Sequence, residues 1–488
     1  MPSKETGQLR IVDSRTENAY LIPIHDNFIR AKDLMAITTP DPKGSDIEQK
    51  LTVLDNGFEN VACMESEITL IDGNRGQIQY RGHPIQELFQ NNDYEDVLYL
   101  LMWGKLPTQA EKLDVRRKFA AAMVPTKTVV DTIAAFPRNS DTYPMCLAGL
   151  CAFMSGDKVI ANNRHTHKPS FHNNFEQADA AIIRTIAYYA TTLALIHCHK
   201  RKLTFTNPDP NGSLIGNLLL MMGKTNKETG VGPDPEIQAC LEKLWICYAD
   251  HEMTNSTAGL LHAGSTLADP GSCAISALVC GFGPLHGGAI DLAYEALGKI
   301  KHPSFVPAYI EMVKSKKARL FGYGHRIYRT RDPRLSLIEE LIEKNREKCD
   351  ANPLLRVAFA IDKLANEDEY FVSRKLKANA DLLGCFLYSA LGFETDMITA
   401  IITLSRIPGG LAHWRETLDK PIKIWRPRQI YTGDRTDDVD APGRQSLSSN
   451  EGPLKEKHGI QVRELNSGKS NKIPLKVKAI LWAKSCFS

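Results

Sequence analysis

Gly283-Pro284-Leu285-His286-Gly287-Gly288 is the central motif of the stretch 248–334, which is the most informative part of the chain about its fold. Three further motifs in this stretch are Asp250-His251-Glu252, Gly322-Tyr323-Gly324-His325-Arg326 and Asp332-Pro333-Arg334. Glycines beside His286 and His325 let the backbone turn without a Cβ penalty and approach a ligand closely. A single histidine is more often a packing residue than a catalytic one. Several such loops in one stretch instead predict a site built from loops on a helical scaffold.

Helical periodicity extends in both directions from this stretch. Apolar residues at 94–103 follow helical spacing and stop at Gly104, and Thr108 is placed to cap the next helix. The Ala-rich run 177–195 is predicted to be a core helix. Further helices are predicted at 237–248, 274–278, 290–297, 335–347 and 381–391. The chain is therefore expected to be mostly α-helical.

Strands are predicted only in the first part of the chain. Short alternating pieces at 20–24 and 51–54 are typical of strands. The segments 67–71 and 77–80 flank Asp-Gly-Asn-Arg-Gly at 72–76, which are residues suited to positive φ. This arrangement predicts a β-hairpin immediately before the helices.

Composition places the chain among ordinary globular proteins. Of its 488 residues, 43% are hydrophobic and 24% are charged, and the length allows two domains with a large core. The formal net charge of +3 provides no general electrostatic case for binding nucleic acid or a membrane. Eleven cysteines without a CxxC pair are typical of free thiols in a reducing compartment.

Targeting signals are not recognisable in the sequence. Residues 1–10 contain neither the apolar core of a secretory signal nor an Arg-rich amphipathic pattern. The final Ser-Cys-Phe-Ser, at 485–488, is neither a peroxisomal tripeptide nor a prenylation box. No run of eighteen apolar residues predicts a membrane-spanning helix. We therefore expect a soluble intracellular protein, cytoplasmic by default.

Histidines, a carboxylate and arginines together describe a site for an acidic substrate and a carbonyl group. A histidine next to glycines can donate a hydrogen bond to a developing oxyanion, and a carboxylate placed opposite can remove a carbon-bound proton. The guanidinium of arginine is well suited to bind a carboxylate through two hydrogen bonds, although a single arginine is more often part of a surface salt bridge. The candidate residues are His286, His325, Asp381, Arg334, Arg406 and Arg426.

Later motifs continue the series begun in the stretch 248–334. They are Asn379-Ala380-Asp381, Ser405-Arg406, Ala412-His413-Trp414 and Arg426-Pro427-Arg428-Gln429-Ile430-Tyr431-Thr432-Gly433. From about Glu65 to Gly433, this ordered set of motifs resembles the citrate synthase family. The order of the whole series is far more specific than any one motif.

The resemblance implies a mostly α, two-domain fold of citrate synthase type with a short N-terminal β region and hairpin. The expected parts are a short-strand region at 1–64, the first part of a large helical domain at 65–286, a small domain closing over the substrates at 287–388, a return to the large domain at 389–433, and a polar tail at 434–488. The tail is rich in charged and small residues, which predicts disorder.

The resemblance also implies the reaction and its residues. The enzyme would condense an acyl-CoA with oxaloacetate and hydrolyse the thioester. Asp381 would take the α-proton of the acyl-CoA, His286 would donate to the thioester oxygen, and His325 would polarise the ketone of oxaloacetate. His251, Arg334 and Arg406 would hold the oxaloacetate carboxylates. No metal and no cofactor is implied, because the acyl-CoA is itself a substrate.

Two further implications concern the second substrate and the assembly. Arg329 would contact a phosphate of CoA, and the loop containing Leu320, Gly322 and Gly324 would hold its adenine. The family resemblance implies a homodimer in which Arg426 reaches into the site across the interface.

The residues after Asp381 leave the acyl substrate open. Leu382, Leu383 and Gly384 stand where many relatives have bulky aromatics or a serine, and smaller side chains would leave volume for extra methylenes. This predicts an alkylcitrate synthase of secondary metabolism that uses a longer acyl-CoA. Two alternatives are a plain citrate synthase in which these positions have drifted neutrally, and a catalytically silent CoA-binding relative.

Overall fold

The fold is described from a computed structural model, which describes residues 5–38, 50–163, 165–166, 169–324, 327–328 and 330–432. The chain divides into two units, Met1–Arg428 and Gln429–Ser488. The described residues 429–432 of the second unit have no regular secondary structure. The predicted polar tail at 434–488 lies outside the described residues.

A two-stranded antiparallel hairpin forms the start of the chain. It pairs β1 (Glu5–Val12) with β2 (Ala19–His25), followed by the 3₁₀ helix η1 (Ala31–Ala36), and it confirms the strand predicted at 20–24. The strand predicted at 51–54 is wrong. Residues 51–54 have no regular secondary structure and pair with no strand among the described residues, and the neighbouring Lys50 forms one isolated bridge with Thr38.

The second sheet confirms the predicted hairpin. Strand β3 (Thr69–Asp72) pairs with β4 (Gln77–Tyr80), and the short β5 (His83–Pro84) completes the sheet. The Asp72 carboxylate accepts from two backbone amides of the turn. Gly73 permits a close approach, since a Cβ there would lie 2.3 Å from the carbonyl oxygen of Ile327. The hairpin therefore packs directly on the loop between Gly324 and Arg334.

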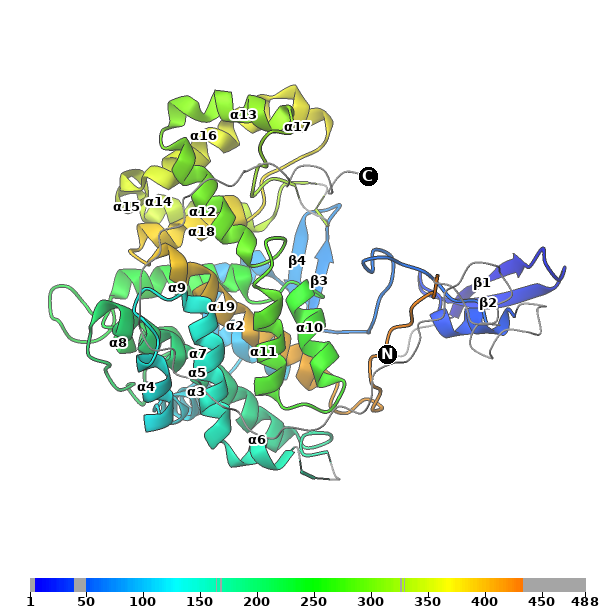
Figure 1. Cartoon of the computed structure of the whole chain (residues 1–488), viewed down its shortest axis with the longest axis horizontal. Coiled ribbons are helices and arrows are strands. Elements are labelled where there is room, and N and C mark those ends of the chain that lie inside the picture. Colours follow the sequence, from blue (N-terminus) through cyan, green and yellow to red (C-terminus); the bar gives the residue numbers. More distant parts are fainter. Residues whose placement is uncertain are drawn as a thin grey trace, which may run out of the picture. The chain divides into compact units, whose positions relative to one another are not determined.

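Helices account for the rest of the described fold and agree with the periodicity of the sequence (Figure 1). They are α1 (Ile85–Asn91), α2 (Tyr94–Trp103), α3 (Gln109–Ala122), α4 (Lys127–Ala134), α5 (Thr142–Gly156), α6 (Lys158–Asn163), α7 (Phe175–Arg201), α8 (Leu214–Met221), α9 (Pro235–Tyr248), α10 (Asn255–Gly264), α11 (Pro270–Cys280), α12 (Gly288–Ile300), η2 (Pro303–Phe305), α13 (Val306–Lys314), α14 (Arg334–Lys344), α15 (Arg346–Ala351), α16 (Pro353–Glu367), α17 (Glu369–Ser373), α18 (Asp381–Ala390) and α19 (Thr395–Glu416).

Local signals account for the helix ends. Gly104 ends α2 with φ of 75°, in the left-handed region that favours glycine. Thr108 caps α3 as predicted, in a capping box with Glu111. The helix predicted at 335–347 is instead divided into α14 and α15, because the backbone leaves the helical conformation at Asn345.

Helix α7 confirms the predicted core helix. It is long and apolar enough to cross a membrane by length and composition, but 89% of its most apolar window is buried inside the fold. It packs on α5, α3, α11 and α19. Its apolar residues are therefore accounted for by the protein core. The cysteines that the structure describes are all free thiols, as predicted.

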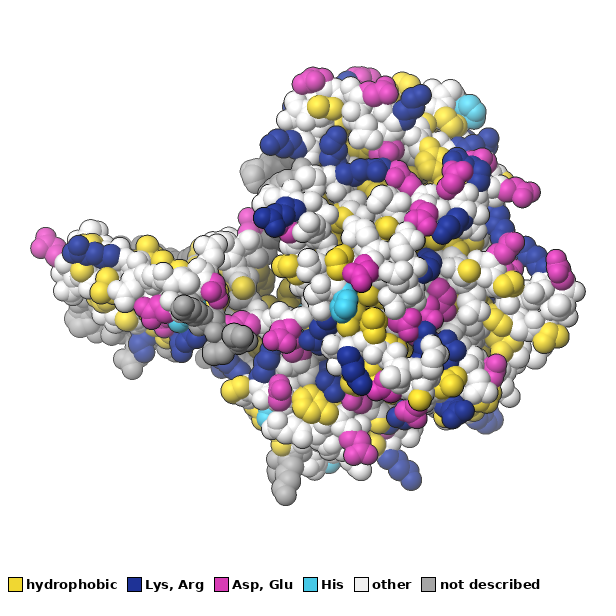
Figure 2. All heavy atoms as spheres, turned by 180° about the vertical axis from the view of Figure 1, so that it is seen from behind, with side chains coloured by type: hydrophobic (Ala, Val, Ile, Leu, Met, Phe, Trp, Pro, Cys, Tyr) yellow, Lys and Arg dark blue, Asp and Glu magenta, His cyan; other side chains and the backbone are white. Residues whose placement is uncertain are grey.

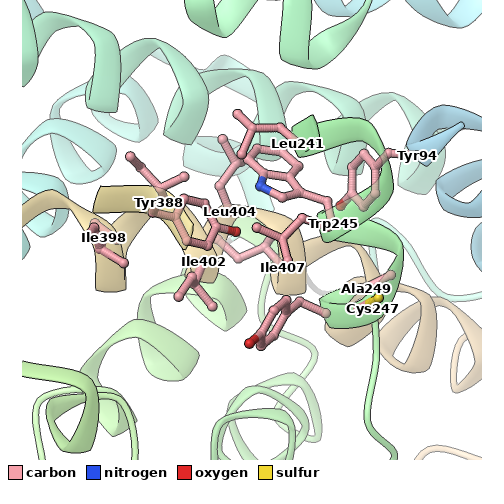
Figure 3. Close-up of a cluster of buried hydrophobic side chains, with 14 of the residues drawn as sticks. Tyr94, Leu241, Trp245, Cys247, Ala249, Tyr388, Ile398, Ile402, Leu404 and Ile407 are labelled. Carbon is pink, nitrogen blue, oxygen red and sulfur yellow. The ribbon is translucent and has the colours of Figure 1, made fainter. Parts of the chain in front are cut away.

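An aromatic cluster fixes the crossing of α9, α18 and α19 (Figure 3). Trp245 of α9 packs edge to face on Tyr94 of α2, with ring centroids 5.1 Å apart. Tyr388 of α18 and Ile407 of α19 are buried in the same cluster. The Asp-His-Glu motif follows the end of α9, Asp381 begins α18 and Arg406 lies within α19, so the cluster packs the helices that position these candidate residues.

Glu242 of α9 is a buried acid at the edge of this core. Its carboxyl oxygens accept from the backbone amide of Tyr94 at 3.1 Å and from the hydroxyl of Ser213 at 3.2 Å. Burial, followed by the nearby carboxylates of Asp93 and Glu95, raises the pKa of Glu242 to about 8.

Acidic and basic side chains are mixed over the face of the molecule shown in Figure 2.

Candidate active site

The Asp-His-Glu motif follows directly from the end of α9. The hydroxyl of Tyr80 donates to the backbone carbonyl of Asp250 at 3.0 Å. The Asp250 carboxylate accepts from the backbone amide of Glu252 at 3.0 Å, and its Oδ2 lies 3.2 Å from Nε2 of His413. Gly409 of α19 is needed here, because a Cβ there would lie 2.3 Å from the carbonyl oxygen of Ala249. Helices α9 and α19 are thus locked together at this point.

The side chains of Asp250 and His413 form a buried pair in which each group favours the charged form of the other. Burial alone would raise the pKa of Asp250, but the facing His413 and the nearby Arg406 outweigh it, so the pKa is lowered. Burial would likewise lower the pKa of His413, but Asp250 outweighs it and the pKa is raised. This pair holds the motif against α19 and was not predicted from the sequence.

His251 is the next residue and points at another aromatic side chain. Its Nε2 lies 2.9 Å from the hydroxyl of Tyr328, and both side chains are buried. The two rings meet edge to face with centroids 5.7 Å apart. Tyr328 is therefore a site residue that the sequence analysis missed, although it lies only two residues after the motif at 322–326.

Arg334 starts α14 and forms a buried, bidentate ion pair with Asp332. Its Nε and Nη2 donate to the two carboxylate oxygens at 3.0 and 2.7 Å. The same carboxylate accepts from the backbone amide of Ala380 at 3.0 Å. The hydrogen bonds described for this guanidinium use Nε and Nη2 and do not involve Nη1. Asp332 thereby connects a candidate substrate arginine to the residue just before Asp381.

Asp381 begins α18 and is exposed at the surface of the site. Its backbone amide donates to Oδ1 of Asn379 at 3.0 Å, and Nδ2 of the same asparagine donates to the carbonyl oxygen of Gly324 at 3.0 Å. The amide of Gly324 donates to the carbonyl of Lys377 at 2.8 Å, and the amide of Asn379 to that of Gly322 at 2.9 Å. The predicted CoA loop is thus bonded to the segment that ends in Asp381.

Two glycines of this loop have left-handed backbone angles, with φ of 74° at Gly322 and 81° at Gly324. At Gly322 a Cβ would lie 2.8 Å from both Cα and Cβ of Leu382. The loop therefore touches the first turn of α18 directly. Leu320, which the sequence analysis placed in the same loop, is half-buried at its start.

His286 and Arg406 lie within electrostatic reach of Asp381. Burial, and then the positive charge of Arg406, lower the pKa of His286, while Asp381 acts in the opposite direction. The imidazole is therefore neutral near pH 7 and can donate through one N–H group. Burial lowers the pKa of Arg406, against the negative charge of Asp250. No hydrogen bond or ion pair joins the Arg406 guanidinium to the residues that the structure describes.

The structure brings together His251, His286, Arg334, Asp381 and Arg406, from five different segments. Arg426, by contrast, is exposed, and the neighbouring Trp425 donates its amide to the Ser265 hydroxyl at 3.0 Å. The described contacts do not connect Arg426 to the other candidates. His325 and Arg329 lie outside the described residues.

A small cavity of about 40 Å³ adjoins Asp381. It lies between α12 and α18, beside Phe321 and Gly322. A larger hollow of about 1270 Å³ is lined mainly by the segment 27–34, which follows the N-terminal hairpin, and by the segments 59–65 and 417–425. We assign the candidate site to the side of the smaller cavity, because Asp381 lines this cavity and the larger hollow has none of the candidate residues in its lining.

The family model for the C-terminal domain of citrate synthase matches residues 57–428. The chain belongs to the citrate synthase family. It is an enzyme of citrate synthase type with a mostly helical fold, as predicted.

Relatives in this family include both citrate synthase-like proteins and alkylcitrate synthases. A citrate synthase-like protein of Phoma sp. is 45% identical over 432 residues, covering 88% of this chain and 92% of the relative. An alkylcitrate synthase of a fungal species is 38% identical over 451 residues, covering 91% and 97%. The solved citrate synthase of Thermoplasma acidophilum, in a ternary complex with carboxymethyl coenzyme A and oxaloacetate, has a TM-score of 0.70 at 26% identity, covering 78% and 97%.

Proposed function

We propose that this citrate synthase-type enzyme joins the α-carbon of an acyl-CoA to the ketone carbon of oxaloacetate and then releases CoA by hydrolysis. The observation that carries this proposal is the convergence of a neutral His286, the carboxylate of Asp381 and the guanidinium of Arg406. The two substrates correspond to the coenzyme A derivative and oxaloacetate in the Thermoplasma complex.

The chemistry divides between an acid and a base. Asp381 takes a proton from the α-carbon while the neutral imidazole of His286 donates to the thioester oxygen, so that an enol forms. The enol carbon attacks the ketone carbon of oxaloacetate, and His325 donates a proton to the ketone oxygen. Water then attacks the thioester carbonyl, and the CoA thiol leaves.

The charged groups fit the carboxylates of oxaloacetate. The guanidinium of Arg406 and the Nη1 edge of Arg334 are positioned to bind them, with His251 held in place by Tyr328. Arg426 completes the site from the neighbouring subunit of a homodimer. Its exposure within one chain supports a role outside that chain's own site.

The acyl-CoA binds along the loop that contains Leu320, Gly322 and Gly324, with Arg329 on a phosphate. A small domain at about 287–388 closes over both substrates, which keeps water from the enol until the carbon–carbon bond has formed. The reaction requires neither a metal nor a redox cofactor, because hydrogen bonds from the protein stabilise the enol.

A thiol-release assay with oxaloacetate and acetyl-, propionyl-, hexanoyl- and decanoyl-CoA tests this proposal. Release of thiol is expected, and Asp381→Asn is expected to lower it by at least about 10²-fold, as is typical of the loss of a general base. Oxaloacetate should still raise the melting temperature of this variant. Binding of CoA without thiol release from any thioester would instead identify a catalytically silent relative.

A further inference from the structure

We propose that the cavity between α12 and α18 receives the hydrocarbon substituent of the acyl-CoA α-carbon, so that the enzyme uses an acyl group longer than acetyl. The first two or three extra carbons lie in the cavity, and Ala289 and Ala293 determine how deep they reach. This inference rests on the proposed function, because it takes Asp381 as the base that removes the α-proton.

Apolar side chains line the cavity on two sides. From α12 they are Ala289, Ile290, Ala293 and Leu297, and from α18 they are Leu382, Cys385 and Phe386. The four α12 positions share one helical face, because they are spaced by one, four and eight residues. Phe321, Gly322 and Asp381 complete the lining.

The cavity begins at the base. The Sγ of Cys385 lies 3.8 Å from Oδ1 of Asp381, one helical turn away, and both residues line the cavity. A general base must lie within hydrogen-bonding reach of the proton that it removes. The α-carbon is therefore held at the mouth of the cavity, and a substituent on it has a direct route inward.

The lining favours hydrocarbon over water. A buried water needs two to four polar partners, and here Asp381 and the thiol of Cys385 are the polar side-chain groups. Burial, and then the nearby Asp381, raise the pKa of Cys385, which agrees with a thiol in apolar surroundings. The volume of about 40 Å³ exceeds the roughly 10–15 Å³ that one water requires, so it has room for two or three carbon atoms.

The small residues after Asp381 do not all contribute to this space. Leu382 lines the cavity, whereas Gly384 faces α9, where a Cβ would lie 2.3 Å from the hydroxyl oxygen of Tyr248. The space near the base therefore comes chiefly from the alanines of α12, which the sequence analysis had not considered. Ala293 is the deeper of the two, with 9% of its surface exposed.

Chain-length selectivity tests the inference. In the parent, each buried methylene is worth about fourfold in kcat/KM, so butanoyl-CoA should exceed acetyl-CoA by about 15-fold. Ala293→Leu adds three carbons to the cavity and should lower the ratio of butanoyl to acetyl kcat/KM at least tenfold. Leu297→Ala removes three carbons from the lining and should raise the ratio of hexanoyl to butanoyl kcat/KM.

Ala296→Leu is the matched control, since Ala296 is half-buried on α12 and does not line the cavity. This variant should keep the parental ratios. If Ala293→Leu does not fold, the smaller Ala289→Val and the enlarging Leu297→Ala carry the test. A parent that prefers acetyl-CoA, or ratios that do not move in any lining variant, would overturn the inference and leave the proposed function standing. Absence of thiol release with every thioester would overturn both.

Discussion

Gly322→Ala should damage both stability and catalysis, because Gly322 is where the proposed CoA loop meets the first turn of α18, which begins with the proposed base Asp381. The native φ of 74° lies in the left-handed region, which costs an alanine about 1–2 kcal/mol. The new Cβ would also lie 2.8 Å from Cα of Leu382, whereas ordinary contacts begin at 3.4 Å. These atoms belong to the first turn of α18, so they cannot move without moving Asp381.

The size of the effect follows from this displacement. Relief of the clash requires a shift of about 0.6 Å, and a misplacement of about 1 Å can cost ~10²-fold in rate. We therefore expect kcat to fall by at least about tenfold, and the free energy of unfolding by about 2–4 kcal/mol. Thiol release measures the first quantity and urea denaturation the second.

Gly298→Ala is the control for Gly322→Ala. Gly298 lies in α12 with open space around its Cβ position, so the alanine should be neutral or stabilising by up to about 1 kcal/mol, with kcat unchanged. Parental kcat and an unchanged urea midpoint in Gly322→Ala would refute the proposed contact between the CoA loop and the base helix.

Three further predictions address a buried acid, the dimer and the support of the base. Folding raises the pKa of Glu242 from 4.5 to about 8, so the native state retains a proton that the unfolded chain loses, and stability should fall as the pH rises from about 4.5 to about 8. In the parent, the free energy of unfolding should fall by up to ~1.4 kcal/mol per pH unit in this range, and Glu242→Gln should remove this fall. If urea denaturation gives parallel curves of unfolding free energy against pH for both proteins, the prediction is wrong. Mixing inactive Arg426→Ala and Asp381→Asn subunits should restore some thiol release through hybrid dimers, and no recovery after verified subunit exchange would exclude a shared site. Asn379→Ala should lower kcat by about tenfold while leaving the KM for oxaloacetate unchanged, because it removes a hydrogen bond that holds the base; an effect on that KM alone would contradict this role.

Local signals were sufficient to predict much of the helical fold. The end of α2 at Gly104 and the cap of α3 at Thr108 depend on neighbouring residues, so the sequence alone specifies them. The segment 51–54 shows the limit of this approach. Its alternating pattern is typical of a strand, but strand formation requires a partner that the local sequence cannot supply.

The candidate site also contains residues that the local sequence specifies and residues that it does not. His251 and Asp381 could be proposed from their motifs, together with the arginines. The groups that hold them were missed because these contacts join residues far apart in the chain, as in the pair of Asp250 and His413, which are 163 residues apart. Periodicity carries no information about such pairs. The proposed role of Ala293 was missed for a different reason, since an alanine on a helix is usually a packing residue.

The backbone bonds between Gly322 and Gly324 on one side and the segment 377–379 on the other have a consequence for protein engineering. They make two stretches of sequence, separated by more than fifty residues, behave as one transplantable unit. An exchange of only the 320–324 loop with a relative would leave Asn379 with unsuitable partners and tilt the start of α18. An exchange of both stretches together should preserve the angle at which the carboxylate meets its substrate, so functional chimeras of this family should have paired junctions.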